Sequence, residues 1–244
     1  MRVPRIYTSQ ALTEHSEFAL EQGPSHHLIK VLRMGSGREL ILFNGEGYEY
    51  RATIVKADKK IATVATTAAH HRDSESPLKT TLAIGISRGD RMEWVIQKAT
   101  ELGVTEIVPL LMERSEVKLT QERQEKKHAS WQQLIIAACE QCQRNRLPKL
   151  QNPTRLSEFL QRTPAERNFV LHHRSDNPLE NHTKLTRPDS VCIVVGPEGG
   201  ISDDELTQLK NNDFEALCLG PRVMRTETAP ISALSILQYL WGDL

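Results

Sequence analysis

The chain has 244 residues, of which 39% are hydrophobic and 25% charged, a mixture typical of a globular protein and not of a disordered one. Its 31 lysines and arginines balance 31 aspartates and glutamates, so net charge alone predicts no nucleic-acid partner. No apolar run approaches the roughly 20 residues that a bilayer span needs, and the first residues lead into no signal-peptide segment, so we expect a cytoplasmic protein.

The first 72 residues predict a small β-rich module. Short strand-like runs alternate with turn residues, and one short helix is expected around residues 26–33. The expected strands are residues 39–43, 48–54 and 61–64. Ten lysines and arginines stand against seven acidic residues here, an excess of 10 − 7 = +3 that only weakly suggests an RNA surface. Residues 70–77 are polar, lack periodicity and end in a proline, so they predict a linker.

From Leu78 onward, apolar strands alternate with helices, which predicts an α/β domain with a largely parallel sheet over residues 78–244. The predicted strands are residues 81–86, 106–111, 168–171, 191–195 and 216–219. The predicted helices are residues 91–102, 121–143, 203–211 and 228–241. Ser202 followed by three acidic residues predicts a capped start for the third helix.

Four cysteines are present, and Cys139 and Cys142 form a C-x-x-C pair. A zinc site of this kind needs a second pair, and a thioredoxin-like motif lies between a strand and a helix start. Residues 131–142 instead predict helix interior, so we expect thiols in the core or on the helix surface, no metal and no oxidising compartment.

Two strand-end turns carry the strongest chemical signal. The apolar strand 191–195 runs into Gly-Pro-Glu-Gly-Gly at residues 196–200, and the strand 216–219 runs into Gly220-Pro221. Such turns expose backbone N–H and C=O groups at the carboxyl edge of a sheet, where ligands bind in open α/β folds. Two turns of matching type predict two walls of one pocket. Their spacing fits neither the dinucleotide fingerprint nor the P-loop.

Several further motifs share a distinctive order with these turns. They are I-Q-K-A-T-E-L-G-V at residues 96–104, E-R-S at 113–115, Glu140-Gln141 with Arg144, G-P-E-G-G at 196–200 and L-G-P-R-V-M-R-T-E-T-A at 219–229. In this order and spacing the chain resembles the SPOUT-superfamily enzymes that methylate N3 of a uridine in bacterial small-subunit (16S) ribosomal RNA.

The resemblance implies a PUA-like RNA-binding β-barrel over residues 1–72 and a SPOUT methyltransferase domain over 78–244, with a deep trefoil knot near the C-terminus. It also implies S-adenosyl-L-methionine as cofactor, a homodimer, and 16S RNA in the assembled small ribosomal subunit as substrate. Neither a metal nor a membrane is implied.

The same resemblance, together with the positions of the turns, assigns candidate site residues. Those expected to bind the cofactor are Leu171, Gly196, Pro197, Glu198, Gly199, Gly200, Ile201, Leu217, Leu219, Gly220, Met224, Thr226, Thr228 and Ala229. Those expected to bind RNA are Arg2, Arg5, Lys30, Arg33, Arg88, Arg91 and Arg144. His172 and His173 end a predicted strand and could border the pocket.

Arg225, Arg114 and Glu198 are the catalytic candidates. Uracil N3–H is a weak acid, so the site needs a proton acceptor and cationic or N–H donors for the charge that develops. The arginines could hold a phosphate or stabilise the uracil anion. Glu198 and Glu227 could orient arginines, cap helices or take the proton, and the sequence does not choose among these roles.

Two alternatives remain open at this level: a non-catalytic RNA-binding assembly factor, and a SPOUT methyltransferase acting on transfer RNA. The intact turns argue against the first, and the motifs between residues 96 and 144 argue against the second. The sequence leaves open the group that deprotonates N3, the RNA contacts, the dimer surface and whether naked RNA is a substrate.

Overall fold

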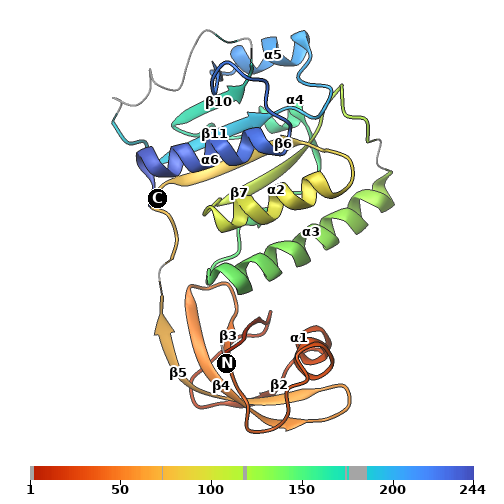
Figure 1. Cartoon of the computed structure of the whole chain (residues 1–244), viewed down its shortest axis with the longest axis vertical. Helices are drawn as coiled ribbons and strands as arrows, with labels where there is room; N and C mark the ends of the chain where they lie inside the picture. The colour runs from red at the N-terminus through yellow and green to blue at the C-terminus, as the bar shows by residue number, and fades with distance from the viewer. Residues whose placement is uncertain (1–2, 73, 118–119, 174, 176–185) are drawn as a thin grey trace. The chain divides into compact units, whose positions relative to one another are not determined.

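The computed structural model describes residues 3–72, 74–117, 120–173, 175 and 186–244 (Figure 1). The chain divides into two compact units. Unit 1 contains Met1–Glu75 and Cys139–Leu147, and unit 2 contains Ser76–Ala138 and Pro148–Leu244. Each unit is described by itself below.

Unit 1 is a five-stranded sheet in the order β1-β3-β4-β5-β2. Its strands are β1 (Arg5–Tyr7), β2 (Glu17–Ala19), β3 (Glu39–Phe43), β4 (Tyr48–Ala57) and β5 (Ala62–His71). β1 pairs with β3 in parallel, and the remaining pairs are antiparallel. Helix α1 (Gln22–His26) continues into the π-helix η1 (His27–Val31). The predicted strands and short helix are therefore confirmed, although β4 and β5 are longer than expected.

The core of unit 1 forms because alternate strand residues face inward. Leu40 and Leu42 on β3 are buried with Ile54 on β4 and Val64 on β5, and Leu28 of η1 packs into the same cluster. The predicted linker was partly wrong. His70 and His71 belong to β5, because they pair with Glu49 and Tyr48 on β4.

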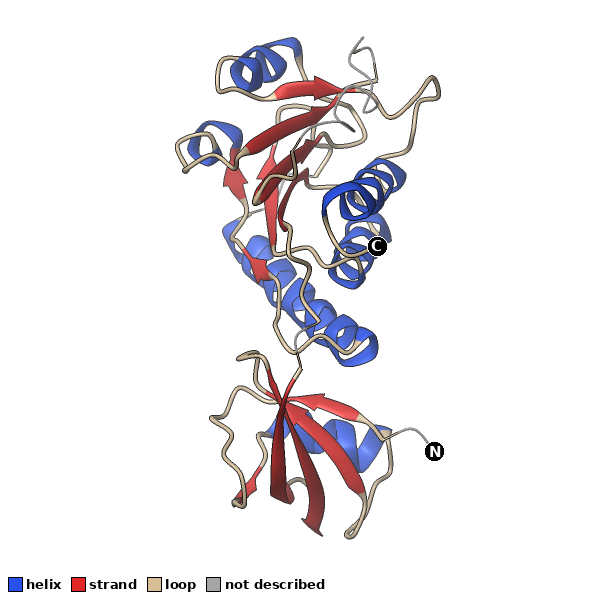
Figure 2. Ribbon diagram, turned by 90° about the vertical axis from the view of Figure 1, so that its left-hand side faces the viewer, coloured by secondary structure: helices blue, strands red, loops and turns tan. Residues whose placement is uncertain are grey.

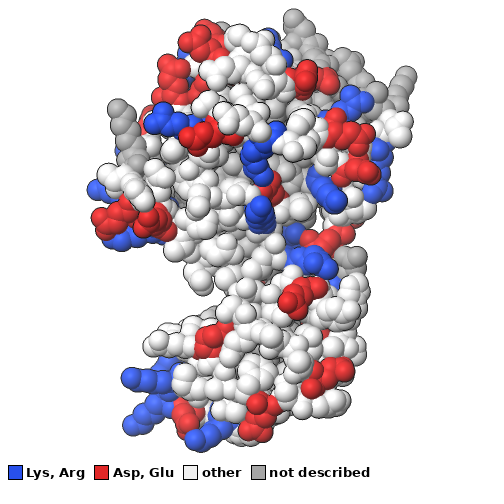
Figure 3. Space-filling model, turned by 180° about the vertical axis from the view of Figure 1, so that it is seen from behind, with Lys and Arg blue, Asp and Glu red and all other residues white. Residues whose placement is uncertain are grey.

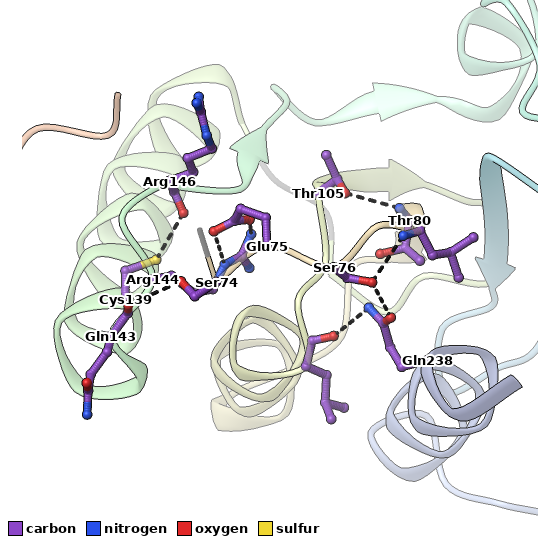
Figure 4. Close-up of polar contacts among 12 residues, drawn as sticks. Ser74, Glu75, Ser76, Thr80, Thr105, Cys139, Gln143, Arg144, Arg146 and Gln238 are labelled. Atoms are coloured by element: carbon purple, nitrogen blue, oxygen red, sulfur yellow. Dashed lines mark hydrogen bonds and ion pairs between the residues drawn. The ribbon is translucent and has the colours of Figure 1, made fainter. Parts of the chain in front are cut away.

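The segment Cys139–Leu147 completes unit 1 through polar contacts that sequence periodicity did not reveal (Figure 4). Glu140 accepts a hydrogen bond from the Tyr7 backbone N–H at 2.9 Å. The Arg144 guanidinium is ion-paired with Glu75, and Asn145 accepts a hydrogen bond from Arg5. The motif residues around Glu140 and Arg144 thus have structural partners within this unit.

Unit 2 is a parallel sheet in the order β12-β10-β11-β6-β7-β8, with β9 also pairing with β7. Its strands are β6 (Lys79–Gly85), β7 (Glu106–Leu111), β8 (Lys149–Leu150), β9 (Thr154–Arg155), β10 (Arg167–Leu171), β11 (Ser190–Val195) and β12 (Glu215–Leu217). Its helices are α2 (Asp90–Glu101), α3 (Gln121–Cys142), α4 (Leu156–Phe159), α5 (Asp203–Lys210) and α6 (Thr228–Trp241), although the last residues of α3, 139–142, belong to unit 1. Helices lie on both sides of the sheet (Figure 2). The predicted α/β class is confirmed.

The central strand β11 explains how the sheet positions a site. Residues 191–195 are all buried, as a parallel strand covered on both faces requires. β6, β10 and β11 run parallel, and β12 joins them beside β10, so their carboxyl ends lie along one edge. The turns that follow β11 and β12 therefore meet at that edge.

Cys139 is buried and Cys142 ends α3, so the prediction of thiols on a helix is confirmed.

Within the described ranges, no helix combines the length and apolar character that a membrane crossing requires. Acidic and basic side chains are interspersed over the face of unit 2 seen in Figure 3, in keeping with the balanced composition.

Candidate active site

Close backbone approach explains the glycines in the turn after β11. A Cβ built on Gly196 would lie 2.7 Å from Ile201 Cγ1, and one built on Gly199 would lie 2.7 Å from the Arg114 carbonyl oxygen. Both distances are shorter than a Cβ tolerates, so larger residues would push the turn away from its neighbours. The turn after β11 is thereby packed against the loop that follows β7.

The start of α5 fixes the other end of this turn. Ser202 Oγ accepts a hydrogen bond from Glu205 N at 3.2 Å, and Glu205 Oε2 accepts one from Ser202 N at 3.0 Å, which is the predicted capping box. The second Glu205 oxygen accepts a hydrogen bond from Glu113 N at 2.8 Å. One buried carboxylate therefore joins α5 to the loop after β7.

A cavity of about 390 Å³ lies between the two glycine–proline turns. Every residue expected to bind the cofactor lines it, except Thr228. Its remaining lining residues are Arg114, His172, His173, Val195, Asp203, Cys218, Arg222 and Val223. His172 and His173 thus border the cavity as anticipated. Val195, Asp203 and Cys218 were missed, although each adjoins a recognised motif.

Glu198 organises the polar side of the cavity. Its Oε1 accepts hydrogen bonds from the Arg88 backbone N–H and from Arg91 Nη1, both at 3.0 Å. Glu227 Oε2 lies 3.9 Å from Arg91 Nε, so two carboxylates from two different turns flank one guanidinium. Glu198 Oε2 is buried and has no hydrogen-bond partner among the described residues.

The Glu198 carboxyl is held in its charged form. Burial by itself would raise its pKa, but the hydrogen bonds from the Arg88 N–H and Arg91, with the positive charge of Arg91, outweigh burial and lower the pKa. Glu198 is therefore a carboxylate at neutral pH that already accepts two hydrogen bonds.

The two arginine candidates for catalysis occupy different places. Arg114 lines the cavity, and its Nη1 donates a hydrogen bond to the Ile201 carbonyl oxygen at 3.2 Å. Arg225 is exposed and does not line the cavity. Its carbonyl oxygen accepts hydrogen bonds from the N–H groups of Thr228 and Ala229, which start α6. Its guanidinium has no ion-pair partner within the described part of the chain.

Two of the arginines expected to bind RNA have other partners. Arg5 and Arg144 are buried, with 7% and 4% exposure, and each is ion-paired, with Glu49 and Glu75 respectively. Arg5 also lies over the Phe43 ring at 5.1 Å. Their guanidinium groups support unit 1 from within and are not presented to an RNA phosphate, which corrects the expectation for these two residues.

The other RNA candidates are on the surface. Lys30 and Arg33 are exposed at the end of η1, and Arg88 and Arg91 are exposed before and at the start of α2. Arg88 is ion-paired with Glu116 at 3.0 Å. Arg2 lies outside the described residues.

Comparisons with known proteins identify the same two parts of the chain. Residues 74–238 match the family model of an RNA methyltransferase domain, and residues 25–66 match that of an RNA methyltransferase PUA domain. The chain is 32% identical to the ribosomal RNA small subunit methyltransferase E of Bacillus subtilis over 95% of this chain and 93% of that protein. The protein of the same name in Buchnera aphidicola subsp. Schizaphis graminum is 32% identical to this chain, over 100% of this chain and 98% of that protein.

Solved structures agree over the whole length. A Legionella pneumophila protein in complex with S-adenosylmethionine has a TM-score of 0.96 and 41% identity, with 100% of both chains covered. The ribosomal RNA small subunit methyltransferase E of Neisseria gonorrhoeae, bound to S-adenosyl methionine, has a TM-score of 0.91 and 35% identity over 100% of both chains. The chain therefore belongs to the ribosomal RNA small subunit methyltransferase E family of RNA methyltransferases, as its motifs predicted.

Proposed function

We propose that this chain transfers a methyl group from S-adenosylmethionine to N3 of a uridine in 16S ribosomal RNA, within the assembled small subunit. The observation that carries the proposal is the cavity between the two glycine–proline turns, because the residues that the motifs assigned to the cofactor form most of its wall. Family membership and the cofactor-bound relatives support the same activity.

The cavity suits S-adenosylmethionine in size and chemistry. Small-molecule sites usually enclose about 300–1,000 Å³ and combine apolar walls with a few polar groups. Leu171, Leu217 and Leu219 provide apolar surface, while the glycine turn leaves backbone groups accessible. Glu198 Oε2, buried beside the cavity, has no hydrogen-bond partner among the described residues and so keeps unused acceptor capacity there. When bound, the cofactor supplies an electrophilic methyl group on a sulfonium.

We assign Glu198 a positioning role and not that of the base. A carboxyl with a lowered pKa is a poor match for removing a weakly acidic proton near neutral pH. It instead fixes Arg91 through a 3.0 Å ion pair. Arg91 and Arg114 then supply the positive charge that the developing uracil anion or a neighbouring phosphate requires.

Arg225 has a different role in this proposal. Because it is exposed and outside the cavity wall, its guanidinium is free to contact the RNA that approaches the cavity. Its carbonyl oxygen helps to start α6, so side-chain removal leaves that backbone contact in place. Substitution of Arg225 should accordingly affect RNA use more than cofactor binding.

The finer architecture is part of the proposal. The resemblance supports a C-terminal trefoil knot in the part of the chain that runs from the edge strand β12 to α6, which packs on α2 and β11. The resemblance further supports a closed PUA-like barrel in a domain over residues 1–72, a methyltransferase domain over 78–244, and a homodimer. Because the proposed substrate is the small ribosomal subunit, we expect the protein to act in the cytoplasm.

The test compares methyl acceptors. Labelled S-adenosylmethionine is incubated with the full chain and small ribosomal subunits lacking the modification, naked 16S RNA, or transfer RNA. Incorporation into subunits, reduced in Arg225→Ala while calorimetric cofactor binding is unchanged, is the expected result. Methyl incorporation into transfer RNA alone would reject 16S RNA as the substrate. Cofactor binding with no methyl transfer to any of the three RNA acceptors would reject the assigned reaction.

A further inference from the structure

An exposed aromatic pair lies at one end of the β4–β5 hairpin in unit 1. Tyr48 starts β4 and His71 ends β5, and the two residues are directly opposite in the antiparallel register. Their rings meet edge to face at 5.1 Å with an interplanar angle of 70°. Tyr48 remains 44% exposed, so its ring is not used to fill the core.

Two arginines are held beside this pair. The backbone N–H of Arg72 donates a hydrogen bond to the Gly47 carbonyl oxygen at 3.4 Å, and Arg72 Nη1 donates one to Gln143 Oε1 at 2.8 Å. The Arg146 guanidinium lies against Gly47, since a Cβ built there would be 2.9 Å from Arg146 Nη2. Gly47 has a φ of +95°, a conformation that also favours glycine.

The backbone of Arg146 is also fixed. Its carbonyl oxygen accepts a hydrogen bond from Cys139 Sγ at 3.8 Å (Figure 4). All of these contacts lie within unit 1, because residues 139–147 belong to it. The arginines are therefore attached to the same framework as the tyrosine.

Among the described residues, no carboxylate neutralises the charge of these arginines. Within the described part of the chain, neither Arg72 nor Arg146 forms an ion pair with a carboxylate, whereas Arg5 and Arg144 in the same unit do. The partner of Arg72 is the neutral amide of Gln143. Asp73, which follows Arg72 in the sequence, lies outside the described residues, while the nearby Glu49 and Glu75 are ion-paired with Arg5 and Arg144.

We propose that Tyr48, His71, Arg72 and Arg146 form a binding surface for an unpaired RNA nucleotide. An exposed aromatic ring next to arginines is the arrangement that binds single-stranded RNA, because the base stacks on the ring and the cations bind adjacent phosphates. This inference rests on the proposed RNA substrate and names the place on unit 1 that holds it, outside the methyl-transfer cavity.

Binding to fluorescein-labelled oligouridylate, measured by anisotropy with the full chain, tests the surface without requiring methyl transfer. Tyr48→Ala should weaken binding about tenfold, the effect of losing one base stack, and Tyr48→Phe should retain wild-type affinity. Arg146→Gln should weaken binding and reduce the slope of log affinity against log salt by about 0.7, as expected for one lost phosphate contact.

Lys60→Gln is the matched control. Lys60 is exposed in the turn at the opposite end of the same hairpin, and its loss changes net charge as Arg146→Gln does. Its effect on affinity should be less than twofold. Equal binding by Tyr48→Ala and the wild type would overturn the proposal, as would a loss in Lys60→Gln that matches the loss in Arg146→Gln.

Methyl transfer separates this surface from the catalytic function. With small subunits as substrate, Tyr48→Ala should raise KM for the subunit about tenfold, leave kcat within about twofold and leave cofactor affinity unchanged. A wild-type chain that binds the oligonucleotide through Tyr48 but transfers no methyl group would reject the proposed function and retain this surface. An unchanged KM in Tyr48→Ala would reject the surface and retain the function.

Discussion

Substitution of Gly199 by alanine tests whether the tight turn after β11 sets cofactor affinity. The added Cβ would lie 2.7 Å from the Arg114 carbonyl oxygen and 2.8 Å from Arg114 Cβ. One of the two loops must move, and overpacking of this kind costs about 1–3 kcal/mol. If that cost falls on the conformation that binds the cofactor, affinity for S-adenosylmethionine should fall about 5- to 150-fold.

Calorimetric titration with S-adenosylmethionine measures this change, and circular dichroism checks that the variant is folded. Gly35→Ala provides the control, because nothing lies within 4 Å of its added Cβ and its backbone conformation is ordinary. The control should bind as the wild type does. A folded Gly199→Ala protein with wild-type cofactor affinity would refute the inference that close approach of these two loops shapes the cavity.

Three further predictions concern stability and pH. Gln238→Leu should lower the free energy of unfolding by about 1–3 kcal/mol in urea titrations, because buried Gln238 accepts a hydrogen bond from Ser76 and donates one to the Leu102 carbonyl oxygen. An unfolding curve with the same urea midpoint and slope as the wild type would contradict this prediction. Glu75→Ala should cost about 3–5 kcal/mol by leaving the buried Arg144 guanidinium without its carboxylate, and a loss under 1 kcal/mol would show that the pair contributes little. The lowered pKa of Glu198 means that its carboxylate stabilises the folded state above the unfolded value near 4.5, and that this contribution is lost as pH falls through the folded pKa. The wild type should therefore be more stable than Glu198→Gln by a constant amount near neutral pH, and this advantage should be lost at lower pH. An advantage of the wild type that grows as the pH falls would contradict the prediction.

Much of the fold followed from periodicity. The buried strand β11 was predicted from its unbroken apolar run, and the start of α5 from Ser202 and the acidic residues after it. The short elements β8, β9 and α4 were not predicted, because two to four residues carry no measurable period. The end of β5 was mistaken for a linker because polar residues at an exposed strand end resemble a loop.

The candidate site was predictable where backbone chemistry determined it. Glycines and prolines at two strand ends indicated both walls of the cavity. The charged residues were harder, because a sequence does not reveal whether an arginine has a carboxylate partner. Arg5 and Arg144 were expected on an RNA surface but are buried in ion pairs, while Arg72 and Arg146 were not predicted as site residues and have no carboxylate partner among the residues that the structure describes.

The central claim is that the chain methylates N3 of uridine in 16S RNA. The most direct test is to treat small subunits lacking the modification with the full chain and S-adenosylmethionine, digest the RNA to nucleosides and identify the product by chromatography and mass spectrometry. The account predicts 3-methyluridine from 16S RNA. A methyl group on ribose, on guanosine or on another position of uracil would contradict it.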